Sequence, residues 1–459
     1  MTQILFSILL LISSGACWSA TLNQALTNTY NTSPDFKDKQ EAVKAEHEKI
    51  VQALAGWRPT VDLSTAMTLN KQVNSGTNKD LLSSSTPSGQ KSNAHEGSLN
   101  LRQNLYSGGA TLAQTNSAEH SIRSAWANLQ STEQTVLLNA IQSYLDLVSK
   151  YKQVELYKAN KAALLKNLED AAEKKRVGEE TITQLANAQA RYADADAQAQ
   201  NAEAQLMGSK ATYERIVGLK APVHMEKAGA FENLPKTLEE VLQTAGEENP
   251  TIIAAQFDHL TAQSEADRVG SNLLPTVDLV GSSSRQETRS DLNYTGIVNQ
   301  NTANYATNHQ VAIQAKVPLY EAGTVRSQKR QALEIASQKR IAIETVRRQI
   351  IEQAIQIWQN YTAAKNNIQN YQKQVEAAQI SLEGTTQEMN VGSKVLLDVL
   401  NAQRDLLQAQ LALVEAEKTY FYESYRLLAI IGRLNAKTLK LDVDYFDPQS
   451  HYQKVRGYF

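Results

Sequence analysis

The chain has 459 residues, 42% of them hydrophobic and 20% charged, so it can bury a sizeable interior and does not resemble a disordered chain. Its 46 Lys and Arg residues nearly balance its 48 Asp and Glu residues, which leaves no strong positive field for nucleic acid. The sequence contains no nucleophile motif, phosphate-binding glycine loop or metal-ligand spacing among its seven histidines. We therefore expect no enzymatic activity, no cofactor and no metal.

Residues 1–20 combine an apolar run with small residues that follow it, which indicates a secretory signal peptide. The run from Ile4 to Ile12 is too short to cross a bilayer as a helix. The only cysteine, Cys17, lies in this segment, where it is either removed with the signal peptide or lipidated. Beyond residue 20 no sufficiently long apolar stretch follows, so we expect no transmembrane helix.

The remaining chain is an internal duplication. At an offset of 216 residues, the segment Pro59–Leu63 (PTVDL) recurs unchanged as Pro275–Leu279. At an offset of 214 residues, two glycines of the first copy match two of the second, namely Gly109 with Gly323 and Gly178 with Gly392. One short gap in a Ser- and Asn-rich segment explains both offsets. The sequence therefore predicts two repeats, over residues 21–218 and 251–432.

Both repeats have the same order of elements: a short helix, a strand, a polar loop, a strand, a very long helix, a Val-Gly turn and another helix. In the first repeat we expect strands at 59–69 and 97–106 around a loop at 70–95, then helices at 110–175 and 182–217. In the second repeat we expect strands at 275–285 and 308–319 around a loop at 286–306, then helices at 324–388 and 395–431.

The predicted strands alternate between apolar and polar side chains. Leu99, Leu101 and Leu105 share one face, and Asn100 and Arg102 share the other. Four strands cannot close by themselves, because bacterial barrels begin at about eight strands and an open edge in lipid leaves backbone groups unsatisfied. The chain must therefore oligomerise if these strands enter a membrane. The alternative is a soluble four-stranded sheet packed on the helices.

The long helices are predicted from a stretch without Gly or Pro at residues 110–177, which would extend for roughly 100 Å as a helix. Near the C-terminus, two series recur every seven residues: Leu400, Leu407, Val414, Phe421 and Leu428, and also Ala402, Ala409 and Ala416. Two such seams indicate a coiled-coil neighbour on each side. A coiled-coil spacer protein is the alternative, although the secretory signal weakens it.

This duplicated plan, with Leu-Tyr-x-x-Gly before each long helix, resembles the TolC family of outer-membrane channels from about residue 21 to the end. The segments that resemble the family most are Val317–Gly323 and Val391–Ala402. The resemblance implies an α+β fold in a homotrimer, with four strands per protomer in a transmembrane β-barrel and long helices in a periplasmic α-helical barrel. It also implies an equatorial collar, built here from residues 219–250 and 433–459.

The function that the resemblance implies is a passive exit duct of a tripartite export system, located in the outer membrane with a large periplasmic extension. The expected partners are a periplasmic adaptor (membrane fusion) protein, an inner-membrane ABC or proton-driven transporter, and outer-membrane lipid. The tail from Tyr445 to Tyr452 resembles members that serve type I secretion, while multidrug efflux stays open. The rival class is a periplasmic adaptor, but adaptors normally carry one helical hairpin, whereas this hairpin occurs twice.

The resemblance also implies a gate at the periplasmic tip of the helices. By position, the gate would comprise Met389, Lys394, Asp398 and Asn401 near the second Val-Gly turn, opposite Thr183 and Gln184 near the first. Asp398 matches the family pattern and would form a ring of three carboxylates, whereas Lys394 replaces an arginine, so a bidentate arginine lock is not expected. The alternative for Lys394 and Asp398 is a solvated i,i+4 ion pair, which contributes only a few tenths of a kcal/mol.

Overall fold

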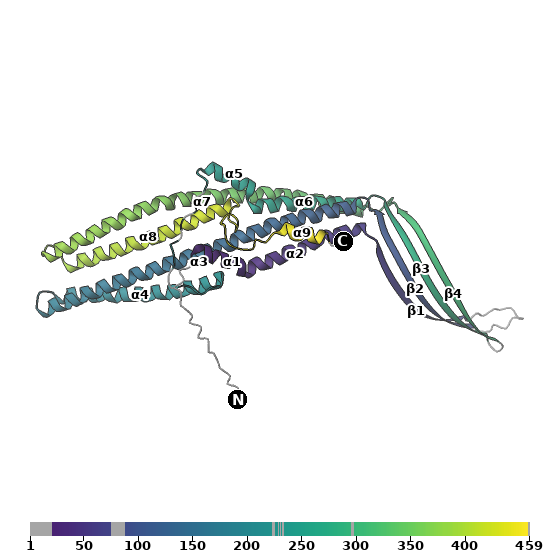
Figure 1. Ribbon diagram of the computed structural model, residues 1–459, viewed down its shortest axis with the longest axis horizontal. Helices are drawn as coiled ribbons and strands as arrows, with labels where there is room; N and C mark the ends of the chain where they lie inside the picture. The colour runs from purple at the N-terminus through teal and green to yellow at the C-terminus, as the bar shows by residue number, and fades with distance from the viewer. Residues whose placement is uncertain are drawn as a thin grey trace, which may run out of the picture. The chain divides into compact units, whose positions relative to one another are not determined.

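The computed structural model describes residues 21–74, 88–222, 225–227, 229, 231, 234–294 and 298–457 (Figure 1). The predicted signal peptide, including Cys17, lies outside the described residues. The chain forms two compact units. The first contains residues through Val43, Ala125–Ala255 and Ile343–Pro448, and the second contains Lys44–Ser124, Gln256–Ala342 and the residues from Gln449 onward.

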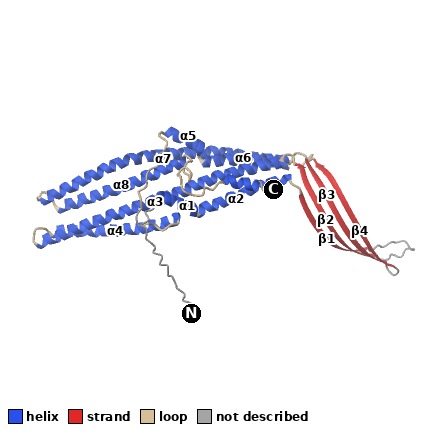
Figure 2. Ribbon diagram, in the orientation of Figure 1, coloured by secondary structure: helices blue, strands red, loops and turns tan. Residues whose placement is uncertain are grey.

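Long helices make up most of both repeats (Figure 2). The helices of the first repeat are α1 (Leu22–Thr32), α2 (Pro34–Leu54), α3 (Ala110–Arg176) and α4 (Ile182–Val217). Those of the second repeat and its flanks are α5 (Leu238–Glu248), α6 (Pro250–Ser271), α7 (Thr324–Asn390), α8 (Leu396–Ile430) and α9 (Pro448–Arg456). Among the described residues, no helix is both long and apolar enough to cross a membrane.

The core of the first unit lies where the long helices meet the segments that follow each repeat. Tyr144, Tyr213 and Leu427 are among its largest fully buried side chains. Tyr144 donates a hydrogen bond from its hydroxyl to the Glu226 carbonyl at 2.7 Å, so the chain after α4 is fixed to α3. Parts of both heptad series of α8 are buried in this protomer, including Leu400, Leu407 and Leu428 of the first and Ala409 and Ala416 of the second.

Of the segments predicted to form an equatorial collar, residues 219–250 and 433–448 belong to this same unit. Arg433, directly after α8, donates two hydrogen bonds of 2.7 Å to the carboxylate of Glu248 at the end of α5. Glu133 on α3 accepts a hydrogen bond of 2.7 Å from the backbone N–H of Ala436. These contacts tie both connecting segments to the helices at defined points, and the segments contribute the short helices α5 and α9.

The second unit holds an antiparallel sheet with the order β1-β2-β3-β4. Its strands are β1 (Thr60–Asn74), β2 (Ser88–Tyr106), β3 (Thr276–Tyr294) and β4 (Val298–Lys316). Strands β1 and β2 form one hairpin and β3 and β4 the other, and β2 pairs with β3 between the two repeats. The outer edges of β1 and β4 have no partner among the described strands.

The strands are longer than the sequence predicted. The predicted loop at 70–95 is too long, because β1 continues to Asn74 and β2 begins at Ser88. The predicted loop at 286–306 is also too long, since only residues 295–297 separate β3 from β4 and lie outside the described residues, as do residues 75–87 of the first loop. The Ser- and Asn-rich segments that suggested loops continue the strands instead, since backbone pairing does not require apolar side chains.

The register gives the sheet one apolar face and one polar face. Val61 lies opposite Leu101, and Leu279 lies opposite Ile313, all on one face. On the other face Arg102 pairs with Asp278 at 2.9 Å, and similar polar contacts join neighbouring strands. The apolar face is strongly exposed in the protomer, with Leu63, Val311 and Ile313 at 74%, 80% and 70% of their full accessibility.

Two further features of the second unit bear on function. Gly109 and Gly323, the predicted repeat markers, adopt positive φ angles of 87° and 79° directly before α3 and α7, which explains the preference for glycine there. The C-terminal helix α9 packs on α2, where the Nδ1 atoms of His47 and His451 are 2.8 Å apart and the two rings are stacked. Arg456 of α9 also forms an ion pair of 3.4 Å with Glu119 on α3.

Candidate functional site

The tips of the two helical hairpins are built alike. Gly178 and Gly392 have positive φ angles of 84° and 83°, and each allows the chain to reverse direction after a long helix. The backbone hydrogen bonds also correspond, since Glu179 N donates to Lys174 O and Ser393 N donates to Glu388 O, both at 2.9 Å. The duplication is therefore expressed in the local geometry of the turns as well as in the sequence.

Two of the predicted gate residues cap the helices that follow these turns. Gln184 accepts a hydrogen bond of 2.9 Å from the Thr181 N–H, and Thr181 Oγ1 accepts one of 3.3 Å from Gln184 N, which forms a capping box. Asp398 accepts a hydrogen bond of 3.3 Å from the Val395 N–H in the corresponding position of α8. Its carboxylate also lies in the first turn of α8, where the helix dipole favours negative charge.

The i,i+4 ion pair that was the alternative to a gate role for Lys394 and Asp398 is not formed in the part of the chain that the structure describes. Lys394 is exposed in the turn before α8, and the Asp398 carboxylate is directed to the backbone of Val395 instead. Thr183 is also exposed. Lys394 and Thr183 are thus exposed on the protomer, while Asp398 is partly exposed.

An apolar cluster joins the hairpins close to their tips. Its buried members come from α3, α4 and α8: Leu164, Ala171, Ala188, Ala195, Leu396 and Leu400. Met389, predicted to belong to the gate, is partly buried against this cluster at the end of α7. Small alanine side chains on α4 permit close approach of α8, so the contact depends on shape as well as apolar area.

Polar contacts between the repeats lie beside this cluster. Arg191 on α4 donates a hydrogen bond from Nη2 to Oδ1 of Asn401 on α8, at 3.1 Å. Asn167 on α3 donates one from Nδ2 to Oε1 of Gln403 on α8, also at 3.1 Å. Of the predicted gate residues, Asn401 is therefore the one whose side chain bonds to the other repeat, and its partner is an arginine.

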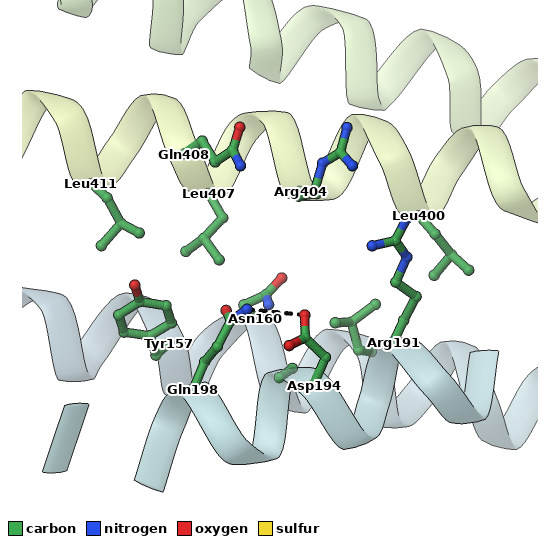
Figure 3. Close-up of a pocket in the computed structure, with 12 residues that line it drawn as sticks. Tyr157, Asn160, Arg191, Asp194, Gln198, Leu400, Arg404, Leu407, Gln408 and Leu411 are labelled. Carbon is green, nitrogen blue, oxygen red and sulfur yellow. Dashed lines mark hydrogen bonds between the residues drawn. The ribbon is translucent and has the colours of Figure 1, made fainter. Parts of the chain in front are cut away.

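A cavity of about 330 Å³ separates α8 from α3 and α4 next to the bond between Arg191 and Asn401. Figure 3 shows Leu407 and Leu411 directed from α8 into the cavity, with Tyr157 and Gln198 facing them from α3 and α4. The contact between the hairpins is therefore incomplete in this region. Beside the cavity, α8 is held to the first repeat by the apolar cluster and by the cross-repeat hydrogen bonds.

The sequence did not identify Arg191, Asn167 or Gln403 as members of this site. The internal repeat could have identified Arg191, because Asn187 is the counterpart of Asn401 and Arg191 lies about one helical turn after Asn187. Arg191 is also a long cationic side chain in an alanine-rich stretch of α4. The family pattern directed attention to the positions beside the turns, whereas this bond lies farther along the helices.

Comparison with known proteins establishes the class. The family model described as "Outer membrane efflux protein" matches residues 22–219 and 241–433, which cover both repeats and most of the described chain. The chain therefore belongs to the outer membrane efflux protein family. This confirms the predicted TolC-type channel class and its α+β fold of long helices and strands.

Individual relatives agree with this assignment. The chain is 28% identical over 445 residues to the outer membrane efflux protein BepC of Brucella suis biovar 1, covering 97% of this chain and 92% of that protein. It is 24% identical over 441 residues to the outer membrane protein TolC of Vibrio cholerae, covering 94% of each. The crystal structure of VceC from Vibrio cholerae superimposes with a TM-score of 0.73 at 18% identity, over 90% of this chain and 96% of that one.

The protein is accordingly an outer-membrane export channel with a periplasmic extension. The strands β2 and β4 lead directly into the long helices α3 and α7 at one end of those helices. The hairpin tips, with their Val-Gly turns, form the opposite end of the long helices.

Proposed function

We propose that three copies of this chain close their sheets into one twelve-stranded barrel and act as a passive exit duct without a chemical step of their own. The observation that carries the proposal is the sheet itself, whose outer strands β1 and β4 have 15 and 19 residues and no partner on their outer edges among the described strands. An unpaired edge in lipid is costly, and pairing β1 of one copy with β4 of the next satisfies both edges. The strongly exposed apolar face then contacts lipid.

The proposed gate lies at the hairpin tips. It comprises Lys394, Asp398, Asn401 and Met389 of the second repeat with Thr183 and Gln184 of the first, and we add Arg191. Threefold symmetry brings three copies of each side chain around one axis, so the exposed Lys394 and the partly exposed Asp398 can meet groups of neighbouring protomers. The bond between Arg191 and Asn401 supports the closed arrangement inside each protomer.

The proposed partners are a periplasmic adaptor protein and an inner-membrane ABC or proton-driven transporter, which supply the energy and the cargo. The duct serves efflux of small molecules or type I protein secretion. Residues 219–250 and 433–459 form the collar around the helices, which is consistent with the ion pair between Arg433 and Glu248 in the first unit. An interaction screen with the candidate transporters of the source cell identifies the cargo class.

Native mass measurement of the detergent-solubilised protein tests the proposed assembly. We expect a single species with the mass of three chains. A monodisperse monomer that still inserts into membranes would contradict the closed barrel, because four strands cannot satisfy their own edges. Proline substitution at Asp62 and, separately, at Leu63 in β1 provides a check, since the N–H groups of adjacent residues face opposite edges of the strand. The proline that removes the outer-edge N–H should cause loss of the trimer while the helical content is retained.

A further inference from the structure

The apolar face of the sheet becomes basic toward the ends of the strands that lie farthest from the helices. Near the helices it carries Val61, Leu101 and Ile313. Farther along, the same face carries a basic cluster that we define as Lys71, Lys91, Arg285 and Arg289, all exposed. The alternation of the strands keeps these residues on the apolar face, because each differs from the apolar positions of its strand by an even number of residues.

The strand register brings the members of the basic cluster together. Lys71 of β1 lies directly opposite Lys91 of β2, and like charges in that position destabilise a sheet. Arg285 lies opposite Gly97, where a Cβ would meet no atom within 4 Å. A shallow cavity of about 440 Å³ forms at this glycine, lined by Met67, His95 and Arg285 among others. The cluster thus has both an unfavourable charge arrangement and open space beside it.

Carboxylates on this face offset only part of the positive charge. Glu287 accepts a hydrogen bond of 2.8 Å from Arg289 Nε, so these two charges are paired with each other. Asp291 lies opposite Lys91 in the register. Glu96 also lines the cavity, but the register places it opposite Ala66, on the polar face. Lys71 and Arg285 therefore remain as surplus cations, two in each protomer and six in a trimer.

The depth of the cluster matches the outer boundary of a membrane. Lys71 lies eleven residues along β1 from Thr60, which at about 3.3 Å per residue and a strand tilt of about 40° raises it roughly 28 Å. The apolar band of an outer-membrane barrel is about 25 Å tall. Arg285 and Arg289 lie nine and thirteen residues from the start of β3, on either side of the same level. The cations therefore meet the headgroups of the outer leaflet.

We propose that the basic cluster binds the phosphate groups of lipopolysaccharide in the outer leaflet, with Lys71 and Lys91 sharing one anion and Arg285 at Gly97 holding another. The inference rests on the proposed barrel, which turns this face toward lipid. Arginine and lysine on such a surface attract anionic headgroups, and a phosphate between two opposed lysines removes their repulsion. The chemical class recognised is a phosphate-bearing glycolipid, and the outward position of the cluster selects it over the phospholipids of the inner leaflet.

The test is lipopolysaccharide retention by the full-length protein purified in mild detergent, measured by native mass spectrometry. The variant is K71Q/K91Q/R285Q, and the matched control is R340Q/K365Q/K373Q, which removes the same charge from exposed positions of α7. We expect wild type and control to retain lipid equally. The variant should bind about fivefold more weakly for each cation removed. The charge-preserving variant K71R/K91R/R285K should bind as wild type does.

Further measurements identify which lipid is bound and show whether its phosphates are required. Lipid A without its phosphates should bind to wild type as weakly as intact lipid A binds to the variant. Phosphatidylglycerol should not compete at equal concentration, and equal competition would overturn the assignment to lipopolysaccharide. Equal retention by the variant and the control would overturn the site itself. A monomeric protein that retained lipid through these residues would contradict the proposed trimer but support the lipid site. Failure of the trimer and failure of the lipid site are therefore distinguishable.

Discussion

Arg191 on α4 and Asn401 on α8 are joined by a hydrogen bond of 3.1 Å that links the first repeat to the second near the hairpin tips. The family resemblance placed the gate cation at Lys394, on the second repeat, but the structure places an arginine on the first repeat in contact with a gate residue. A guanidinium can hold an amide oxygen in one orientation, because its donors are fixed in a plane. The proposed gate therefore includes a cation from the first repeat, on the helix opposite Asn401.

Replacing Arg191 with alanine should loosen the tip. The change removes a half-buried hydrogen bond from a charged donor, which contributes roughly 1 to 2 kcal/mol in each protomer. We expect a higher resting conductance in single-channel recordings, and a similar increase for Asn401→Ala. Arg215→Ala, at an exposed position of the same helix, is the matched control and should leave conductance unchanged. Unchanged conductance in both Arg191 and Asn401 variants would remove this bond from the gate.

Substitutions at Asp398 separate a pore charge from a helix cap. Asp398→Asn keeps an oxygen acceptor for the Val395 N–H but removes the charge, whereas Asp398→Ala removes both. If the carboxylates form a ring at the axis, both variants should lose cation selectivity and block by divalent cations to the same degree. The alanine variant alone should lose about 1 kcal/mol of helix stability. Selectivity equal to wild type in the asparagine variant would assign Asp398 to the cap only.

Much of the architecture could be predicted from the sequence because the determinants are local or repeated. Gly178 and Gly392 marked both hairpin turns, and the uninterrupted stretch after Gly109 gave a helix that the structure ends at Arg176. The strand ends could not be predicted, since the polar residues around Asn70 and Arg289 are held by backbone pairing with neighbouring strands. For Arg289 the partner on β2 is Asn93, which lies in the other repeat, so no local pattern in the sequence encodes this pairing.

The contact between Arg191 and Asn401 could not be predicted for a related reason. Position relative to the Val-Gly turns identified Asn401, but its partner depends on how far α4 and α8 slide past each other. That offset is set by the packing of Leu164, Ala195 and Leu400, which no local pattern encodes. The capping roles of Gln184 and Asp398 were in contrast readable, because both occupy the third position of a helix.

The attachment of α9 to α2 should weaken in acid. Burial and the neighbouring His451 ring lower the pKa of His47 to about 4 from 6.5, while Glu46 raises it; Tyr452 is the other titratable ring packed against it. The unfolded chain therefore binds a proton first as pH falls. The stability that neutral His47 contributes is present above pH 6.5 and is lost between about 6.5 and 4.

The measurement is the melting temperature of wild type and His47→Phe in detergent at pH 7.5, 5.5 and 4.5. The phenylalanine keeps a ring beside His451 but does not titrate, so its melting temperature should fall less in acid than that of wild type. His309→Phe, at an exposed position of β4, should follow wild type. If the melting temperatures of wild type and His47→Phe fell equally with pH, protonation of His47 would not be the cause of the acid destabilisation.

Glu133 gives the opposite pH dependence. Burial raises the pKa of its carboxyl above the usual 4.5, against the opposing effects of the Ala436 N–H and Lys437. The charged form is thus disfavoured in the folded state, and the contribution of this group to stability falls as pH rises above 4.5.

Glu133→Gln keeps the acceptor for Ala436 and should be at least as stable as wild type at pH 7, with no difference at pH 4. Glu133→Ala leaves the N–H unpaired and should lose about 1 to 3 kcal/mol. A glutamine variant as unstable as the alanine variant at pH 7 contradicts this account.

The central claim is that the assembled chain is a channel closed at its helical tips. The most direct measurement is single-channel recording of the purified protein in a planar bilayer, with the Arg191→Ala variant beside the wild type. We predict discrete, uniform conductance steps for both proteins, small for wild type and larger for the variant. Stable insertion of both proteins without any conductance would contradict the claim, because a closed barrel continuous with a loosened helical tunnel must pass ions.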